Sequence, residues 1–213
     1  EQTTGDEGRF GLPEVMPVIN IDTYDVPISS KEVYIGGLLS LTETEEQYAL
    51  DNVTIEIRGR GNYSWYNTEK KSYRVKFAEK VNVLGQGNGP ARSWTLLAVH
   101  CDQSMLRNAA AFDFASKLSG LTYVSSASFV KLYLNGDYQG VYQLSEQMQV
   151  QEYRVNVNDQ GEQEDTGFLV ELDAYASENV ISDGYGNQYE IKSDVWNIEQ
   201  RIFIQDYMMA AFY

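Results

Sequence analysis

The residues with the clearest capacity for chemistry in this 213-residue chain are basic, and many of them lie in one short stretch. Seven of the sixteen Lys and Arg residues fall within the 23 positions 58–80, namely Arg58, Arg60, Lys70, Lys71, Arg74, Lys76 and Lys80. Only Glu69 and Glu79 oppose them there, although the whole chain carries a net charge of −15. Two interpretations are open: a solvated strand face, or a site for a compact anion such as phosphate, which Arg and Lys bind through charge-assisted hydrogen bonds.

The first part of this stretch is a glycine-flanked turn, Gly59-Arg60-Gly61-Asn62. Glycine permits a sharp bend, and such a bend lets the backbone and the Arg60 guanidinium approach a phosphate beside Asn62. The alternative is that Arg60 ties the turn to an acidic loop. For the nearby Trp65 we favour a core position.

The second part is a predicted strand from Lys70 to Phe77, whose alternation places Lys71 on the apolar face and Lys70 on the other. A lysine that points toward an apolar face needs an acidic partner, because an unpaired buried charge is very costly. We choose Glu146 as that partner, and a phosphate-binding role is one interpretation of Lys71. The alternatives are that Lys71 reaches solvent at the sheet edge, or that Lys70 takes its place if the register is shifted by one residue.

A strand-rich α+β domain is expected to carry these residues. Aromatic residues make up 13% of the chain, including sixteen Tyr, which suits half-buried sheet faces. The patterns predict strands near 16–21, 32–41, 53–58, 70–77, 93–99 and 167–172, a hairpin of 129–134 with 140–144 around Asn135-Gly136, and helices over 105–118 and from about 193. Strands that greatly outnumber helices favour α+β, with antiparallel or mixed sheets and a few packed helices, over a doubly wound fold.

The composition disfavours several classes of function. The negative charge argues against nucleic acid and anionic membrane as partners, and no apolar run reaches the roughly 18 residues that a membrane span needs. His100 and Cys101 are the only residues of their kinds, too few ligands for a His/Cys zinc site. We expect Cys101 to be a small core residue. No nucleophile–base pair supports a hydrolase.

Several blocks in order resemble the CotH kinase family, named after a bacterial spore-coat protein. They are RGNYSW at 60–65, KKSYRVKF at 70–77, WTLL at 94–97, DQSMLRN at 102–108, LYLNGDYQGVYQLSE at 132–146, then Arg154 and VELD at 170–173. The resemblance covers roughly residues 16–175. One block would be weak evidence, but five with sensible spacing are strong.

The resemblance implies a distant relative of the protein-kinase fold that uses ATP and Mg²⁺ to phosphorylate Ser or Thr of a protein substrate. It also implies a bacterial protein that is secreted, attached to the cell surface or associated with spores. On this basis we predict a nucleotide site made of Arg60, Asn62, Lys70, Lys71 and Glu146. Kinases need such a cation over the nucleotide phosphates, and an acidic residue that holds it.

Other residues in the matching blocks also have structural interpretations. Asp102 or Ser104 is expected to cap the mid-chain helix, and Arg107 and Asn108 are expected to pin that helix to the sheet. Arg154 and Asp173 form a structural ion pair or line the cleft. The Asn-Gly hairpin is expected to be structural.

The family's metal-binding region, a GP-x-W-D-x-D type element, has no counterpart in this sequence. The last predicted helix also lacks a terminator and is apolar all round, so we expect it to be buried on several sides. We therefore predict a disordered or extraneous segment over 1–15 and a CotH-like domain over 16–213 that ends before the catalytic aspartates and is inactive alone. The alternative function is a non-catalytic, kinase-like binding module in a bacterial surface or extracellular assembly.

Overall fold

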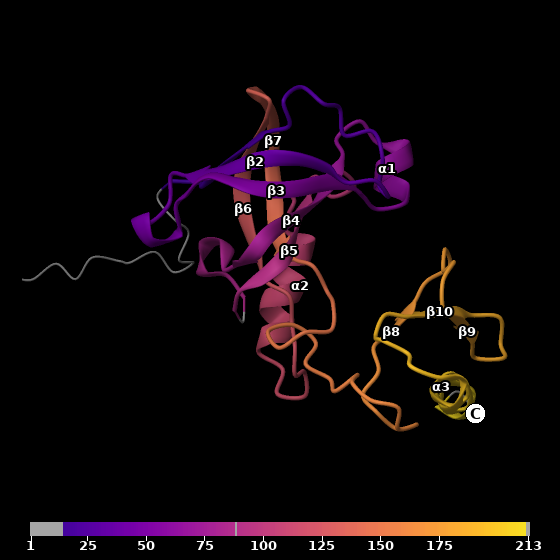
Figure 1. Ribbon diagram of the computed structural model, residues 1–213. Helices are drawn as coiled ribbons and strands as arrows, with labels where there is room; N and C mark the ends of the chain where they lie inside the picture. The colour runs from indigo at the N-terminus through magenta and orange to yellow at the C-terminus, as the bar shows by residue number, and fades with distance from the viewer. Residues whose placement is uncertain (1–14, 88, 212–213) are drawn as a thin grey trace, which may run out of the picture. The chain divides into compact units, whose positions relative to one another are not determined.

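The computed structural model describes residues 15–87 and 89–211 (Figure 1). The segment predicted to be disordered or extraneous therefore lies outside the described residues, apart from its last position. The chain divides into two compact units. The first ends at Phe114 and resumes over Ser126–Gln147, and the second comprises Ala115–Ser125 and Met148–Tyr213.

The first unit is a closed barrel of seven strands (Figure 1). The strands are β1 (Val18–Asp22), β2 (Ile35–Thr42), β3 (Leu50–Arg60), β4 (Ser72–Val81), β5 (Ala91–Leu97), β6 (Ala127–Leu134) and β7 (Asp137–Glu146). Their order around the barrel is β1-β2-β3-β4-β5-β7-β6, and β6 closes the circle by pairing in parallel with β1. The other neighbouring strands pair antiparallel.

The barrel closes around the apolar face that the alternating patterns predict. Ile57, Val75 and Trp94 form one cross-strand row on β3, β4 and β5, and each is at most 2% exposed. Burying a large apolar side chain contributes roughly 1.5–3 kcal/mol, so rows of this kind hold the barrel together. The Trp94 indole N–H also donates to the carbonyl oxygens of Val81 and Ala91, at 3.2 and 3.1 Å.

The predicted hairpin is confirmed, with its turn at Asn135-Gly136 between β6 and β7. Both residues have positive φ, 50° and 84°, as the tight turns that favour Asn-Gly require. The Asn135 side chain accepts a hydrogen bond from the Thr23 backbone N–H at 2.7 Å. The turn is thereby fastened to the end of β1.

Short helical segments complete the first unit. They are α1 (Tyr63–Asn67), which the sequence patterns missed, the 3-10 turns Glu46–Tyr48 and Val83–Gly85, and most of α2 (Arg107–Ser116). The helix α2 begins two residues later than predicted, because Met105 has a positive φ of 58° that a helix cannot contain. Cys101 is exposed in the turn before α2, so the prediction of a core position is wrong.

The second unit has a three-stranded antiparallel sheet and one helix. Its strands are β8 (Val170–Leu172), β9 (Val180–Ser182) and β10 (Gln188–Ile191), in the order β8-β10-β9, followed by α3 (Ile198–Ala211). Within the described part of α3 only Gln200 and Ile204 are buried, whereas Ile198, Ile202 and Tyr207 are more than half exposed. Within this chain the three short strands cover only one stripe of the helix, so the burial on several sides that its apolar residues indicate stays a prediction.

The predicted α+β class is confirmed at this level, with antiparallel pairing dominant and few helices. The closure of one sheet into a barrel was not predicted. Among the described residues, no helix is long and apolar enough to cross a membrane.

Candidate functional site

One end of the barrel gathers most of the predicted site residues. Trp65 of α1 covers this end and packs against the core, which confirms its predicted core position. Gly59 on β3 makes room for it, because a Cβ atom built at Gly59 would lie 2.3 Å from the indole ring. We call the group of Trp65, Lys70, Lys71, Tyr73 and Tyr142 at this end the lysine cluster.

Lys71 is held in the lysine cluster by its backbone and by its ammonium group. Its Nζ donates to the Trp65 carbonyl oxygen at 2.6 Å and lies 5.6 Å from the centre of the Trp65 ring. Its own carbonyl oxygen accepts a hydrogen bond from the Tyr142 hydroxyl at 2.9 Å. The Lys71 ammonium therefore lies beside a ring that packs against the barrel core.

Lys70 occupies the neighbouring position. Its Nζ donates to the Val141 carbonyl oxygen at 2.5 Å and lies 4.5 Å from the centre of the Tyr142 ring. Partial burial lowers the Lys70 pKa, and burial together with the nearby Tyr73 raises the pKa of the Tyr142 hydroxyl. The ammonium group of each lysine thus contacts one carbonyl oxygen and one aromatic ring. An ammonium group has three N–H donors.

A third lysine joins this region from a loop that precedes β2. Lys31 donates from Nζ to the Asn62 side-chain oxygen at 2.5 Å and lies 5.4 Å from the Tyr66 ring centre. Gly61 has a φ of +93°, which confirms the sharp bend predicted here. Arg60 is exposed at the last position of β3, opposite Ser72. Its predicted tie to an acidic loop, like its phosphate role, stays a prediction.

Glu146 is buried at the end of β7, but the structure does not bring it to Lys71. Its Oε2 accepts hydrogen bonds from the backbone N–H and the hydroxyl of Ser126, at 2.9 and 3.3 Å. Glu146 lies opposite Trp94, which lies opposite Val75. Val75 is four residues along the chain from Lys71, or about 13 Å at the usual strand rise. The predicted Lys71–Glu146 pair is therefore not formed.

The loop between β4 and β5 lies against Glu146 instead. Gly87 has a φ of +75°, and a Cβ atom built there would be 2.1 Å from Glu146 Oε1. Gln86, one position earlier, donates to the Leu144 carbonyl oxygen at 3.0 Å. The glycine in this loop therefore permits a close approach to the carboxylate.

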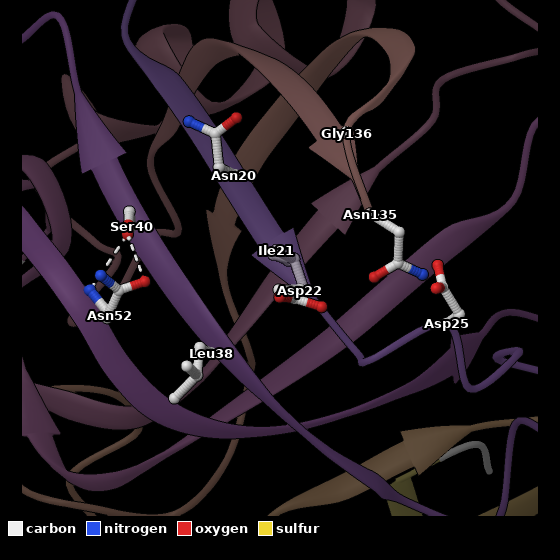
Figure 2. A pocket seen from close by; sticks show the side chains of 9 residues that line it. All are labelled: Asn20, Ile21, Asp22, Asp25, Leu38, Ser40, Asn52, Asn135 and Gly136. Atoms are coloured by element: carbon white, nitrogen blue, oxygen red, sulfur yellow. Dashed lines mark hydrogen bonds between the residues drawn. The ribbon is translucent and has the colours of Figure 1, made fainter.

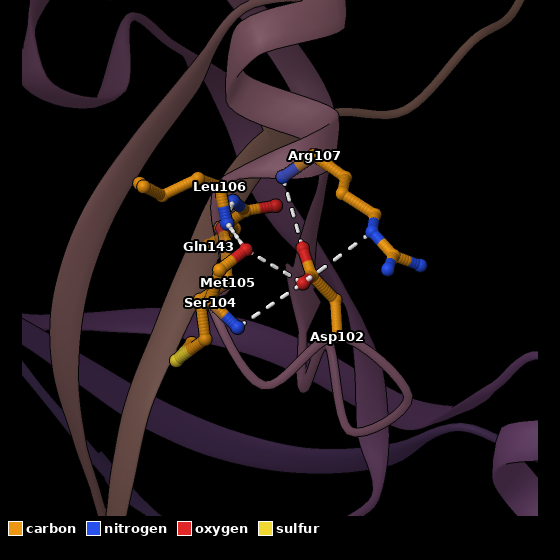
Figure 3. A network of polar contacts seen from close by, with 6 residues as sticks. All are labelled: Asp102, Ser104, Met105, Leu106, Arg107 and Gln143. Atoms are coloured by element: carbon orange, nitrogen blue, oxygen red, sulfur yellow. Dashed lines mark hydrogen bonds and ion pairs between the residues drawn. The ribbon is translucent and has the colours of Figure 1, made fainter.

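The DQSMLRN block builds a helix cap (Figure 3). Asp102 Oδ2 accepts the Arg107 backbone N–H at 2.9 Å, and Oδ1 accepts the hydroxyl and the backbone N–H of Ser104, at 2.7 and 3.1 Å. These bonds, the Ser104 hydroxyl first, lower the Asp102 pKa. The predicted capping role of Asp102 is confirmed.

The residue that anchors α2 to the sheet is Gln143, and not the predicted Arg107. The Arg107 side chain is 80% exposed and its Nε faces Asp102 at 3.7 Å, so its predicted contact with the sheet is wrong. The buried Gln143 of β7 donates from Nε2 to the Met105 carbonyl oxygen at 2.5 Å instead. Asn108 is half-buried in α2, and its role stays a prediction.

In the second unit, Arg154 and Asp173 do not pair with each other. Arg154 is buried and donates from Nη1 to the Tyr153 carbonyl oxygen at 3.0 Å. The Asp173 carboxylate accepts the Tyr175 backbone N–H at 2.8 Å, as in a local turn. The predicted ion pair is therefore not formed.

A shallow hollow of about 300 Å³ lies on the outer face of the barrel, over β1, β2 and the hairpin turn (Figure 2). Its lining is mostly polar, with Ser40 and Asn52 joined by hydrogen bonds, and with Asn20, Asp22 and Asn135 beside them. None of the predicted nucleotide-site residues lines it. The described residues contain no group of three or more His, Cys, Asp or Glu side chains that fits a metal ion.

The comparison with known families decides the relationship. The model of the family described as CotH kinase protein matches residues 57–207, more than two thirds of the chain. This chain belongs to the CotH kinase family. The CotH match begins within β3 and ends within α3, so it takes in parts of both units. No curated protein matches the chain significantly.

Proposed function

We propose that this CotH domain binds ATP with its phosphates at the lysine cluster, in support of phosphoryl transfer to a protein hydroxyl. The observation that supports this most is the convergence of Lys70, Lys71 and Lys31 at one barrel end, within or beside the family match. Phosphoryl transfer depends mainly on positioning and on positive charge around the phosphates.

The hydrogen-bond pattern of the lysines suits this role. Lys70 and Lys71 are each fixed by a carbonyl oxygen and an aromatic ring, which reduces the side-chain entropy that binding would otherwise remove. Because each ammonium has three donors and is held by one carbonyl oxygen, further donors remain for phosphate oxygens. Asn62 and Arg60 extend the polar surface on the neighbouring turn.

The family also implies Mg²⁺, which proteins usually bind through one or two carboxylates together with the substrate phosphates. The described residues contain no group of three or more His, Cys, Asp or Glu side chains that could hold a metal ion. We therefore assign no metal ligand and derive no step through the ion. The proposal is limited to the cations that contact the nucleotide.

The wider setting is also a proposal. The acceptor would be Ser or Thr of a secreted, surface or spore-associated bacterial protein, as the family implies. A non-catalytic binding module is the second candidate, and exposed aromatic side chains on the second unit favour it. Tyr175, Tyr185 and Trp196 are all more than half exposed there, and such side chains anchor many protein interfaces.

Two measurements separate the candidates. In the first, millimolar ATP is expected to raise the melting temperature of the chain, and the double variant Lys70→Met, Lys71→Met is expected to lose most of this shift. Lys80→Gln, which changes an exposed lysine on the following strand β4, serves as the control. An equal shift in all three proteins excludes the lysine cluster as the nucleotide site.

The second measurement is transfer of radiolabel from γ-labelled ATP to protein by the full-length protein. Transfer that falls at least about tenfold in the double variant supports the kinase. ATP binding without any transfer by the full-length protein supports the binding module.

A further inference from the structure

Two arginines stand side by side on the outer face of the barrel, away from the lysine cluster. Arg58 on β3 and Arg74 on β4 are direct cross-strand partners. Their chain neighbours Ile57, Tyr73 and Val75 point into the core, so the two guanidinium groups lie on the opposite, outer face. Opposed residues of this kind have Cβ atoms about 4.5–5.5 Å apart, and like charges there repel.

No carboxylate within the described residues relieves this repulsion. Glu56, two residues before Arg58 on β3, forms an ion pair with Lys76 at 3.2 Å. Arg58 lies 5.0 Å from the centre of the Tyr34 ring, and Arg74 donates to the Ser93 hydroxyl at a long 3.4 Å. Neither arginine forms an ion pair in the part of the chain that the structure describes.

The pair is also partly desolvated. The Nε atoms of Arg58 and Arg74 are buried without a hydrogen-bond partner, although both side chains keep part of their surface exposed. Burial lowers the Arg74 pKa, and the charge of Arg58 adds to this effect while Tyr34 opposes it. The fold thus maintains two close, poorly solvated cations in a chain that is strongly acidic overall.

The lysine cluster differs from this pair in the hydrogen bonds that its cations form. Lys70 and Lys71 have short hydrogen bonds to backbone carbonyl oxygens, so the protein itself supplies part of their coordination. Among the residues that the structure describes, the two arginines share one long hydrogen bond to an oxygen, from Arg74 to Ser93. Positive charge that the protein leaves uncompensated is the feature expected of an anion site.

We propose that Arg58 and Arg74 form a binding site for a phosphate group, flanked by the Ser93 hydroxyl and by Lys76. A guanidinium presents its donors as a planar fork, and two forks side by side match the several oxygens and double charge of a phosphate. Tyr34 holds the first fork in place by a cation–π contact. The phosphate belongs either to a nucleotide or to a phosphorylated side chain, two sources with the same chemistry at this site.

The test is a calorimetric titration of the whole chain with inorganic pyrophosphate. We expect Arg58→Gln and Arg74→Gln each to weaken binding by about tenfold or more, since each removes a charged hydrogen-bonding partner. The matched control, Lys80→Gln, removes one positive charge from an exposed position on β4 and is expected to change the affinity less than about twofold.

Thermal unfolding without ligand provides an independent readout. Because either Gln variant removes a repulsion, its melting temperature is expected to be no lower than that of the natural sequence. If one Gln variant does not fold, the other is used for the test. Arg74→Lys keeps the charge but loses the planar fork of donors, so its affinity for pyrophosphate is expected to lie between those of the natural sequence and Arg74→Gln.

Competition then identifies the source of the phosphate. Displacement of pyrophosphate by ATP but not by phosphoserine assigns the site to a nucleotide, and the reverse assigns it to a phosphorylated side chain. The proposal is overturned if both Gln variants bind pyrophosphate like the natural sequence, or if the Lys70→Met, Lys71→Met variant alone abolishes binding. Because the assay measures no transfer, failure of the proposed kinase activity would leave its result intact.

Discussion

The barrel and the second unit are stabilised by different kinds of interaction. In the barrel, buried apolar side chains from all seven strands form one cluster. In the second unit the buried apolar cluster has only Ile181, Tyr189, Ile191 and Ile204, and a buried amide, Gln200, takes a central place. Its Nε2 donates to the carbonyl oxygens of Gly161 and Gln163 at 2.8 Å each, and its Oε1 accepts the Trp196 backbone N–H at 2.8 Å.

The difference shows that the amount of regular structure in a small unit determines whether apolar burial or individual hydrogen bonds stabilise it. Apolar burial grows with the area that strands and helices can cover. Three short strands and one helix cover little area, so individual hydrogen bonds that order the long 159–166 loop gain importance. The barrel is therefore expected to respond to lost volume, and the second unit to lost polar partners.

The largest effect is expected from Trp94→Ala in the barrel. Trp94 is 1% exposed, and emptying such a position costs about 3–5 kcal/mol in the free energy of unfolding. Urea denaturation followed by circular dichroism measures it. Trp196→Ala in the second unit, where the ring is 52% exposed, should cost about 1 kcal/mol. Equal losses would remove the contrast between the two units.

Gln200→Leu is expected to cost about 3 kcal/mol locally, because it leaves several buried backbone groups without partners. The loss should appear as faster amide hydrogen exchange in β9, β10 and α3, with exchange in the barrel unchanged. Gln205→Leu on the same helix provides a comparison, since Gln205 is half-exposed and forms hydrogen bonds with the backbone of a single residue, Ser182, within the described part of the chain. Unchanged exchange in Gln200→Leu would show that apolar contacts suffice there.

Gly59→Ala tests the tight packing at the lysine cluster. The new methyl group would enter the space of the Trp65 ring, and we expect a loss of about 1–3 kcal/mol. Gly36→Ala on β2 is the matched control, because its Cβ atom would meet nothing within 4 Å. A loss for Gly36→Ala as large as that for Gly59→Ala would mean that strand flexibility, and not Trp65, explains the effect.

The smallest effect concerns a polar contact in the barrel unit. The folded state lowers the Asp102 pKa, so the resulting stability is complete above the ordinary carboxyl value of about 4 and is lost as the pH falls through the lowered pKa. Urea midpoints of the natural sequence and of Asp102→Asn should therefore stay apart from pH 6 down to about pH 4 and converge as the pH falls further. A difference that stays constant with pH would exclude the carboxylate's charge as the cause.

Local patterns predicted much of the barrel. Alternation along β3 separates the buried Ile55 and Ile57 from the exposed Glu56 between them, and the Asn135-Gly136 dipeptide marks its hairpin. Neither pattern contains information on distant partners, so the parallel pairing of β1 with β6 was not predicted. Short β9 and β10 have too few residues for a period-2 signal.

Only part of the candidate site was predicted, again because local patterns contain no information on distant partners. The RGNYSW and KKSYRVKF blocks identified the region where Lys70, Lys71 and Asn62 lie. Lys31 comes from a loop with no distinctive pattern and reaches Asn62 only in the folded chain. Glu146 was paired with Lys71 by analogy with kinases. The strand register places Glu146 opposite Trp94, and its carboxylate accepts a hydrogen bond from the Ser126 backbone N–H.

The closure of the barrel by β1 and β6 has a consequence for biosynthesis. The two strands are separated by more than a hundred residues, which a ribosome adds in roughly 5–20 s. During that interval β1 pairs with β2 while its other edge stays open, and open edges recruit strands of other chains. Because such non-local pairing is also slow to form, the nascent barrel is expected to depend on chaperones until β6 has emerged.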